Sequence, residues 1–186
     1  MHIENVALNR NEVKALCKQL KRDFPLSERL PYFMFRRALM KVGVMKAVYG
    51  IDKGQRCGYI IYAPSNIDGF INILYFAIDP SRRSSGLGGE FLKLFAKEYA
   101  PGGVFLEVED PEKGKDKADA DIRKRRVGFY ERNGYHLVQN TALRLFGSHL
   151  LVMANTDTQV KDWRKLYHKL YDDIIGRKFN GLSFDR

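Results

Sequence analysis

The sequence predicts a single α+β domain built around a mixed sheet. Three strand-like runs follow one another between residues 44 and 78, separated by short segments rich in Gly, Asp and Asn, which predicts an antiparallel meander. A strand, a helix and a second strand are then expected within residues 70–109, and such a unit requires parallel pairing of its strands. The chain of 186 residues has no internal repeat and no Pro- or Ser-rich linker, so we expect one domain over residues 1–186.

Two helices are expected before the meander. Asn9 or Asn11 can cap the first helix, whose apolar residues have helical spacing: Val13, Leu16, Cys17 and Leu20. The second helix is expected from Pro31 to Gly43, because these residue types favour a helix start and a helix end. Its crowded aromatic residues are expected in the core or along the wall of a groove: Tyr32, Phe33 and Phe35.

The strands of the meander are expected over residues 44–51, 57–64 and 70–78. A Gly-rich turn follows the last of them. A helix over residues 90–100 is then expected to stop before Pro101, and the next strand covers residues 104–109.

The second half of the chain begins with a charged insertion at about residues 110–126. Its acidic and basic residues nearly balance, which favours a solvated helix or a mobile loop. Its basic residues could alternatively reach a phosphate or an acidic substrate: Lys113, Lys115, Lys117 and Arg123 to Arg126. A short helix is expected over residues 127–135.

Strands are expected near residues 136–146 and 149–155. The chain then closes with an amphipathic helix over about residues 158–175, because apolar residues recur there at helical spacing: Val160, Trp163, Tyr167, Leu170 and Ile174.

Composition limits the partners and the compartment. The formal net charge of +10 favours anionic ligands, including nucleic acid and phosphate-rich molecules, without choosing among them. No run of residues approaches the length of a membrane span, so we expect no membrane association. The start of the chain does not resemble a secretion signal, and there are two cysteines, Cys17 and Cys57, so we expect a cytoplasmic protein.

The segment DPSRRSSGLGGEF, from Asp79 to Phe91, places three glycines and two serines between a strand and a helix. The N–H groups at a helix start lack intrahelical partners, and glycine allows a bulky anion to approach them. A nucleoside-triphosphate loop would require Lys and then Ser or Thr after the last glycine, but Glu90 and Phe91 follow Gly89. A dinucleotide fingerprint would require glycine at Phe91.

The remaining pattern, R-x-x-G-x-G from Arg83 to Gly88, resembles the acyl-CoA pyrophosphate loop of the GNAT superfamily of N-acyltransferases. A second segment, GFYERNGY from Gly128 to Tyr135, resembles the late helix of that superfamily. The resemblance covers about residues 70–138. It implies a three-layer fold in which helices flank a central mixed, mostly antiparallel sheet.

The resemblance also implies acetyl-CoA as acyl donor and a set of site residues. The strands over residues 71–79 and 104–109 would splay apart, with the pantetheine arm in the gap and the backbone N–H groups near Phe76 and Ile78 facing the thioester. The turn would hold the pyrophosphate through Arg83, Ser84, Ser85, Gly86, Leu87, Gly88 and Gly89. Tyr130 occupies the position of the tyrosine whose hydroxyl reaches the CoA sulfur. Many members have an Asn where this chain has Arg123, which puts the local CoA contact in question.

A general base is expected on the strand over residues 104–109. Its alternation places Glu107 and Glu109 on one face, about 7 Å apart. Either carboxylate could take a proton from an amine, directly or through water, or attract a cationic acceptor; solvated glutamates at the end of a strand are the alternative. Glu107 is the better candidate, because Glu109 adjoins the loop.

The function expected from these features is acetyl-CoA-dependent N-acetylation of an amine by direct attack. The acceptor, an amine-bearing small molecule or peptide, is not specified by the sequence, and neither is the oligomeric state. The alternatives are a basic nucleic-acid-binding domain and a non-catalytic acyl-CoA-binding module. The four histidines lack metal-ligand spacing, so no metal is expected.

Overall fold

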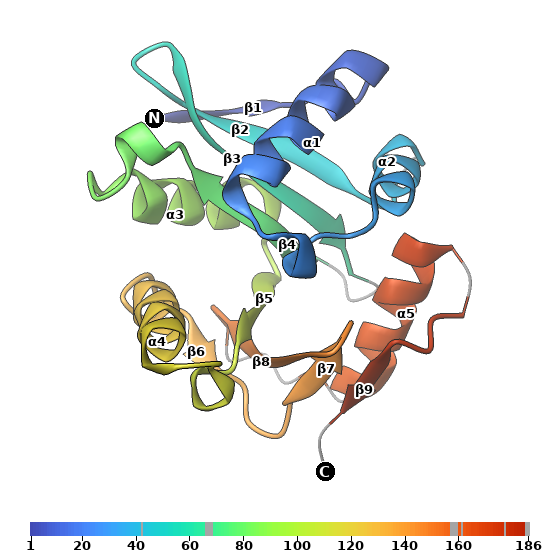
Figure 1. Ribbon diagram of the computed structural model, residues 1–186. Helices are drawn as coiled ribbons and strands as arrows, with labels where there is room; N and C mark the ends of the chain where they lie inside the picture. Colours follow the sequence, from blue (N-terminus) through green and yellow to red (C-terminus); the bar gives the residue numbers. More distant parts are fainter. Residues whose placement is uncertain (42, 66–68, 157–159, 161, 177, 185–186) are drawn as a thin grey trace.

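The computed structural model describes residues 1–41, 43–65, 69–156, 160, 162–176 and 178–184 (Figure 1). Its sheet has nine strands in the order β1-β2-β3-β4-β5-β8-β7-β9, and β6 also pairs with β8. The strands are β1 (His2–Asn5), β2 (Lys46–Asp52), β3 (Gln55–Pro64), β4 (Phe70–Ile78), β5 (Gly103–Glu109), β6 (His136–Leu137), β7 (Leu143–Leu145), β8 (Ser148–Ala154) and β9 (Leu182–Phe184). All the pairings are antiparallel except that of β4 with β5, so the predicted mixed sheet is confirmed.

Five α-helices and three short 3₁₀ turns connect these strands within the described residues. The helices are α1 (Arg10–Asp23), α2 (Tyr32–Met40), α3 (Leu87–Tyr99), α4 (Lys117–Glu131) and α5 (Trp163–Ile175). The turns are η1 (Leu26–Glu28), η2 (Pro80–Arg82) and η3 (Pro111–Lys113). No described helix is both long enough and apolar enough to cross a membrane.

Side-chain caps fix where several helices begin. The Asn9 side chain accepts hydrogen bonds from the backbone N–H groups of Asn11 and Glu12, both at 3.0 Å, so Asn9 is the cap of α1. Asp162 accepts from the N–H of Lys165 and starts α5 later than the expected residue 158; residues 157–159 and 161 lie outside the described residues.

The charged insertion is mostly helix. The short helix expected at residues 127–135 is wrong at both ends: α4 starts at Lys117 and stops at Glu131. The Asp116 side chain caps α4 by accepting from the N–H of Asp119 at 2.8 Å. The charged segment therefore continues into the GFYERNGY motif as one helix.

The helices form a layer on each face of the sheet. The first core cluster joins one face to α1, α2 and α5, and the second joins the other face to α3 and to the end of α4. Phe35, Tyr59 and Tyr167 are among the fully buried residues of the first cluster, and Phe91 and Phe95 of the second. Figure 1 shows α1 and α2 together and α3 on the other side of the sheet. The predicted three-layer α+β architecture is confirmed.

The sheet opens between β4 and β5. The two strands pair in parallel over four residue pairs, from Phe70 with Gly103 to Ile73 with Leu106. Beyond these pairs β4 continues against β3, with Leu74 forming a bulge, and β5 continues against β8. The predicted splay of the two strands is therefore present, and it makes room for a cavity.

Candidate active site

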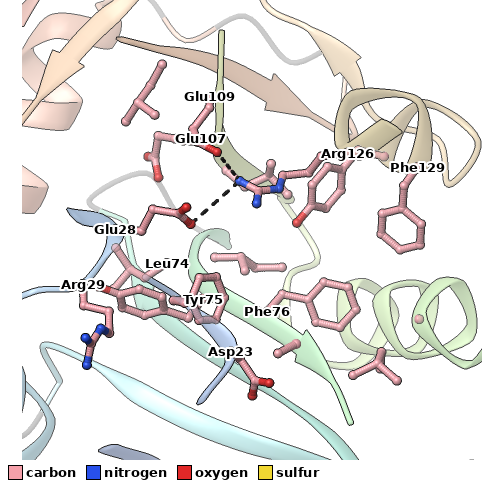
Figure 2. A pocket seen from close by; sticks show the side chains of 18 of the residues that line it. Asp23, Glu28, Arg29, Leu74, Tyr75, Phe76, Glu107, Glu109, Arg126 and Phe129 are labelled. Carbon is pink, nitrogen blue, oxygen red and sulfur yellow. Dashed lines mark hydrogen bonds and ion pairs between the residues drawn. The ribbon is translucent and has the colours of Figure 1, made fainter. Parts of the chain in front are cut away.

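A cavity of about 900 Å³ lies where β4 and β5 diverge (Figure 2). The Gly-rich turn lines one end, through residues that include Arg83, Ser84, Gly86, Gly88 and Gly89. The middle is lined by residues 73–78 of β4, by β5 and by the end of α4. Residues 27–30, the β7–β8 hairpin and Tyr171 line the other end, whereas Asp23 lies beside the turn. One cavity thus brings together segments from both halves of the chain.

The turn is held by its own side chains. Arg83 donates from Nε to the Ile78 carbonyl at 3.0 Å and from Nη2 to Asp23 at 3.3 Å, so its guanidinium is folded back onto the protein. Ser85 donates from Oγ to the Arg82 carbonyl at 2.6 Å. Ser85 and Leu87 are not among the residues that line the cavity. The backbone N–H groups at the start of α3 remain for an anion, and Ser84 lines the cavity beside them.

Gly86 caps α3 in a left-handed conformation, with φ of +83°. A Cβ at this position would have no protein atom within 4 Å, so the glycine leaves open space directly before the helix. Gly88 and Gly89 have a different role: a Cβ on Gly88 would contact Phe129, and one on Gly89 would collide with Asn133. These two glycines let the end of α4 pack on the start of α3.

Phe76 and Ile78 lie on β4 next to the turn, opposite Ile60 and Gly58 of β3. Phe76 stacks on Phe129 with ring centroids 6.2 Å apart, and both Phe76 and Ile78 line the cavity. The two predicted positions therefore face the middle of the cavity, between the turn and β5.

Tyr130 also lines the middle of the cavity, although it is only 9% exposed. Its ring packs edge-on against Phe129 and Tyr135. Burial disfavours the phenolate and raises the pKa of Tyr130 to about 12. The hydroxyl is consequently protonated at neutral pH and can donate a hydrogen bond.

Glu107 and Glu109 both line the cavity, on the face of β5 that the strand alternation predicts. The Asn72 amide donates to Glu107 at 2.9 Å. Burial raises the pKa of Glu107 to about 7, and Tyr167 and Asn72 offset part of this rise. Glu109 instead forms ion pairs with Arg126 at 2.6 Å and with Arg123 at 3.5 Å. The two glutamates therefore have different chemistry.

Arg123, where the resemblance would place an Asn, is a structural residue. It is buried and does not line the cavity. It pairs with Asp119 at 2.8 Å and donates to the carbonyls of Asp110 and Lys113. The suggestion that Arg123 reaches a phosphate is therefore wrong, because its guanidinium is used to hold η3 and β5 on α4.

Glu28 is a cavity residue that sequence reasoning missed. It is the last residue of η1, in a short link that carries no hydrophobic period, and its carboxylate lies 3.9 Å from Arg126. Arg126 was considered as a phosphate ligand, but Figure 2 shows it between Glu109 and Glu28 inside the cavity. Within the described residues, no group of three or more His, Cys, Asp or Glu side chains could hold a metal ion.

No protein-family model and no curated protein matches the chain. Solved structures do match. A protein from Bacteroides thetaiotaomicron assigned to the GNAT family of acetyltransferases is similar at a TM-score of 0.76 and 21% identity, over 96% of this chain and 100% of that chain.

Two further matches were solved with a ligand. An aminoglycoside 6'-N-acetyltransferase complexed with coenzyme A has a TM-score of 0.60 at 19% identity, over 87% of this chain and 100% of that chain. Arabidopsis thaliana NAA60 in complex with acetyl-CoA has a TM-score of 0.58 at 14% identity, over 82% of this chain and 96% of that chain. Together with the splayed β4–β5 pair and the Gly-rich turn before α3, these likenesses establish that the chain has the fold of the GNAT acetyltransferases.

Proposed function

We propose that the chain is an acetyl-CoA-dependent N-acetyltransferase that acylates an amine by direct attack. One observation carries the proposal: a single cavity runs from the N–H groups at the start of α3, through the gap between β4 and β5, to the half-buried Glu107 side chain. Similar folds were solved with coenzyme A and with acetyl-CoA. The cavity therefore joins an anion site to a base through a narrow passage. This arrangement matches a long phosphorylated thioester at one end and an amine at the other.

The donor end fits a pyrophosphate. The start of α3 offers unpaired N–H groups and the positive end of the helix dipole, and open space lies next to Gly86. We propose that Ser84, Gly86 and Gly88 border the phosphates, with Phe76 and Ile78 along the thioester arm. Acetyl-CoA supplies the acetyl group as a thioester.

Glu107 is the proposed base. An amine must be neutral to attack, and an acceptor amine enters as an ammonium ion at neutral pH. A carboxylate whose pKa is about 7 takes up the ammonium proton far more readily than an ordinary glutamate. Glu109 is less suited to this role, because two arginines already pair with it.

Tyr130 is proposed to act on the leaving group. Its protonated hydroxyl can donate a hydrogen bond to the sulfur as negative charge develops there. With a pKa of about 12 the phenol keeps its own proton, so the sulfur receives the second proton of the attacking nitrogen.

A cytoplasmic location is also proposed. Cys17 and Cys57 are free and buried in separate parts of the structure, as in proteins kept in a reducing compartment.

The first test is a calorimetric titration with acetyl-CoA of the wild type and of Gly86→Val. We expect micromolar affinity for the wild type, about −8 kcal/mol at 1 μM, and no measurable binding for the variant, whose side chain fills the space before α3. Gly43→Val is the matched control, because Gly43 has the same left-handed backbone, with φ of +81°, and no neighbour within 4 Å of a Cβ.

Both variants should lose a similar amount of stability, while only Gly86→Val loses the ligand. Acetyl-CoA binding by the two variants alike would refute the assignment of the turn. Binding without release of free thiol in the presence of any amine would favour a non-catalytic acyl-CoA-binding module.

A further inference from the structure

We infer that Glu28 is a specificity-determining residue that serves as the counter-ion for a second cationic group on the acceptor, beyond the amine that is acetylated. The inference rests on the proposed function and names its substrate class: diamines and larger amines with separated positive charges.

Glu28 is placed in the acceptor end of the cavity by its turn. The hydroxyl of Tyr75, on β4, accepts a hydrogen bond from the Leu30 N–H at 2.9 Å and so fixes the segment after η1 on the sheet. The side chains of Glu28, Tyr75 and Glu107 line the same cavity. In Figure 2 the Glu28 side chain points across the cavity toward Arg126.

The charges at this end of the cavity do not balance. Glu109 forms ion pairs with Arg126 at 2.6 Å and with Arg123 at 3.5 Å, and Arg123 also forms an ion pair with Asp119. The same Arg126 nitrogen is 3.9 Å from Glu28, which is beyond hydrogen-bond distance. No ion pair of Glu107 occurs among the described residues. Arg126 and Arg123 thus pair more closely with Glu109, and Arg29 donates to the Pro25 carbonyl at 3.3 Å. Among the described residues, no cation lies within hydrogen-bond distance of Glu28 or Glu107.

Burial makes the incomplete ion pairing of Glu28 energetically costly. The Glu28 side chain is 21% exposed, and loss of water raises its pKa more than Arg126 lowers it. A ligand cation that approached Glu28 more closely than 3.9 Å would compensate a carboxylate that the protein leaves incompletely paired. Arg126 itself shows that a cationic group can lie opposite Glu28.

The cation that suits Glu28 is organic rather than a metal ion. The described carboxylates do not come together in a group of three that could hold a metal. Glu107 and Glu28 are instead two separate anionic positions in one cavity. One ammonium group of a diamine would give its proton to Glu107 and be acetylated, while the other would stay charged beside Glu28.

The test compares kcat/KM for 1,4-diaminobutane and for butylamine, which differ by one amine. Two equivalent amines give the diamine a twofold statistical advantage, and we expect the wild type to exceed this by about tenfold, the contribution of one partly buried ion pair. Glu28→Gln should reduce the ratio to about two. Glu112→Gln is the matched control, because it removes the same charge from the exposed turn η3 and should keep the wild-type ratio.

A second variant is expected to change the preference for the diamine in the opposite direction. Arg126→Gln removes the cation that faces Glu28, so the diamine preference should rise above that of the wild type. If Glu28 were needed only to hold η1 in place, neither variant would change the ratio of the two amines, because both substrates would suffer equally.

Binding without turnover separates this inference from the proposed function. Calorimetric titration of the protein with 1,4-diaminobutane, in the presence of coenzyme A, requires no acetyl transfer. Diamine binding that depends on Glu28 without any thiol release would overturn the proposed function, while supporting Glu28 as the counter-ion of a bound cation. Equal acetylation of diamine and monoamine, unchanged in Glu28→Gln, would overturn the inference and leave the proposed function intact.

Discussion

Glu107 and Glu109 are two residues apart on one strand, yet their neighbours make one a base and the other an anchor. Asn72 hydrogen-bonds Glu107, whose pKa is raised by burial, whereas Glu109 lies between two arginines. Ion pairs with Arg126 and Arg123 let Glu109 hold α4 against β5. Burial leaves Glu107 able to change its protonation state near neutral pH.

This difference predicts a pH–rate profile. Glu107 acts as a base only when it is ionised. We therefore expect kcat/KM to rise with pH, to show an inflection near pH 7 and to become constant at higher pH. In Glu107→Gln the inflection should disappear and the rate at pH 8 should fall by about 10²–10⁴-fold. Steady-state kinetics across pH 5.5–9 measure this, with Glu112→Gln as the control that keeps the inflection. An unchanged inflection in Glu107→Gln would remove the residue from the mechanism.

Alternation along β5 was sufficient to predict that Glu107 and Glu109 share a face. Their chemistry could not be predicted, because the partners that decide it lie far away in the sequence: Asn72, Arg123, Arg126 and Tyr167. Tyr130 was predicted from its motif, and its role in catalysis stays a prediction. Glu28 carried no signal, since one charge in a short link has no periodicity to reveal which way it points.

At the scale of elements, α4 shows how a charged sequence becomes a helix. Its first turns contain few apolar residues, so the hydrophobic pattern that marks other helices is absent there. Asp116 caps it, and Arg123 takes a buried position that an apolar residue would normally occupy. Charge pairing across the helix, η3 and β5 substitutes for hydrophobic packing.

Arg123→Gln should therefore destabilise the protein by about 1–3 kcal/mol, because it removes the buried guanidinium that pairs with Glu109 and Asp119 and donates to two backbone carbonyls of η3 and its flank. Arg125→Gln, an exposed change on the same helix, should alter stability by less than about 0.5 kcal/mol. Urea unfolding followed by circular dichroism measures both. Equal effects of the two changes would show that Arg123 contributes no more than a surface residue.

The meander, the Gly-rich turn and α3 were predictable because strand alternation, turn residues and helix spacing agree along residues 44–100. The edge strands β1 and β9 were not predicted. They contain four and three residues, too few to establish a period, and they form because a neighbouring strand offers a free edge.

At the scale of the whole molecule, stability should depend on the same carboxylate as catalysis. The pKa of Glu107 is raised on folding from 4.5 to about 7, so the folded protein holds this proton more tightly than the unfolded chain does. The resulting stabilisation is complete below pH 4.5 and is lost as pH rises through 7.

We therefore expect the free energy of unfolding of the wild type to fall by about 3 kcal/mol relative to Glu107→Gln between pH 4.5 and pH 8. Urea titrations of both proteins at several pH values give this difference, and the other titrating groups cancel from it. A pH-independent difference would show that Glu107 titrates normally in the folded protein.

The parting of β4 and β5 creates two strand edges inside the molecule. Free edges normally invite pairing with strands of other chains and lead to aggregation. Here α4 and η1 border the opening, and Arg126 faces Glu28 across it at 3.9 Å. A slender molecule can enter between the edges, but a second polypeptide strand with its side chains meets this barrier. The interrupted sheet is therefore open to a slender ligand, while the side chains of α4 and η1 oppose pairing with a strand of another chain.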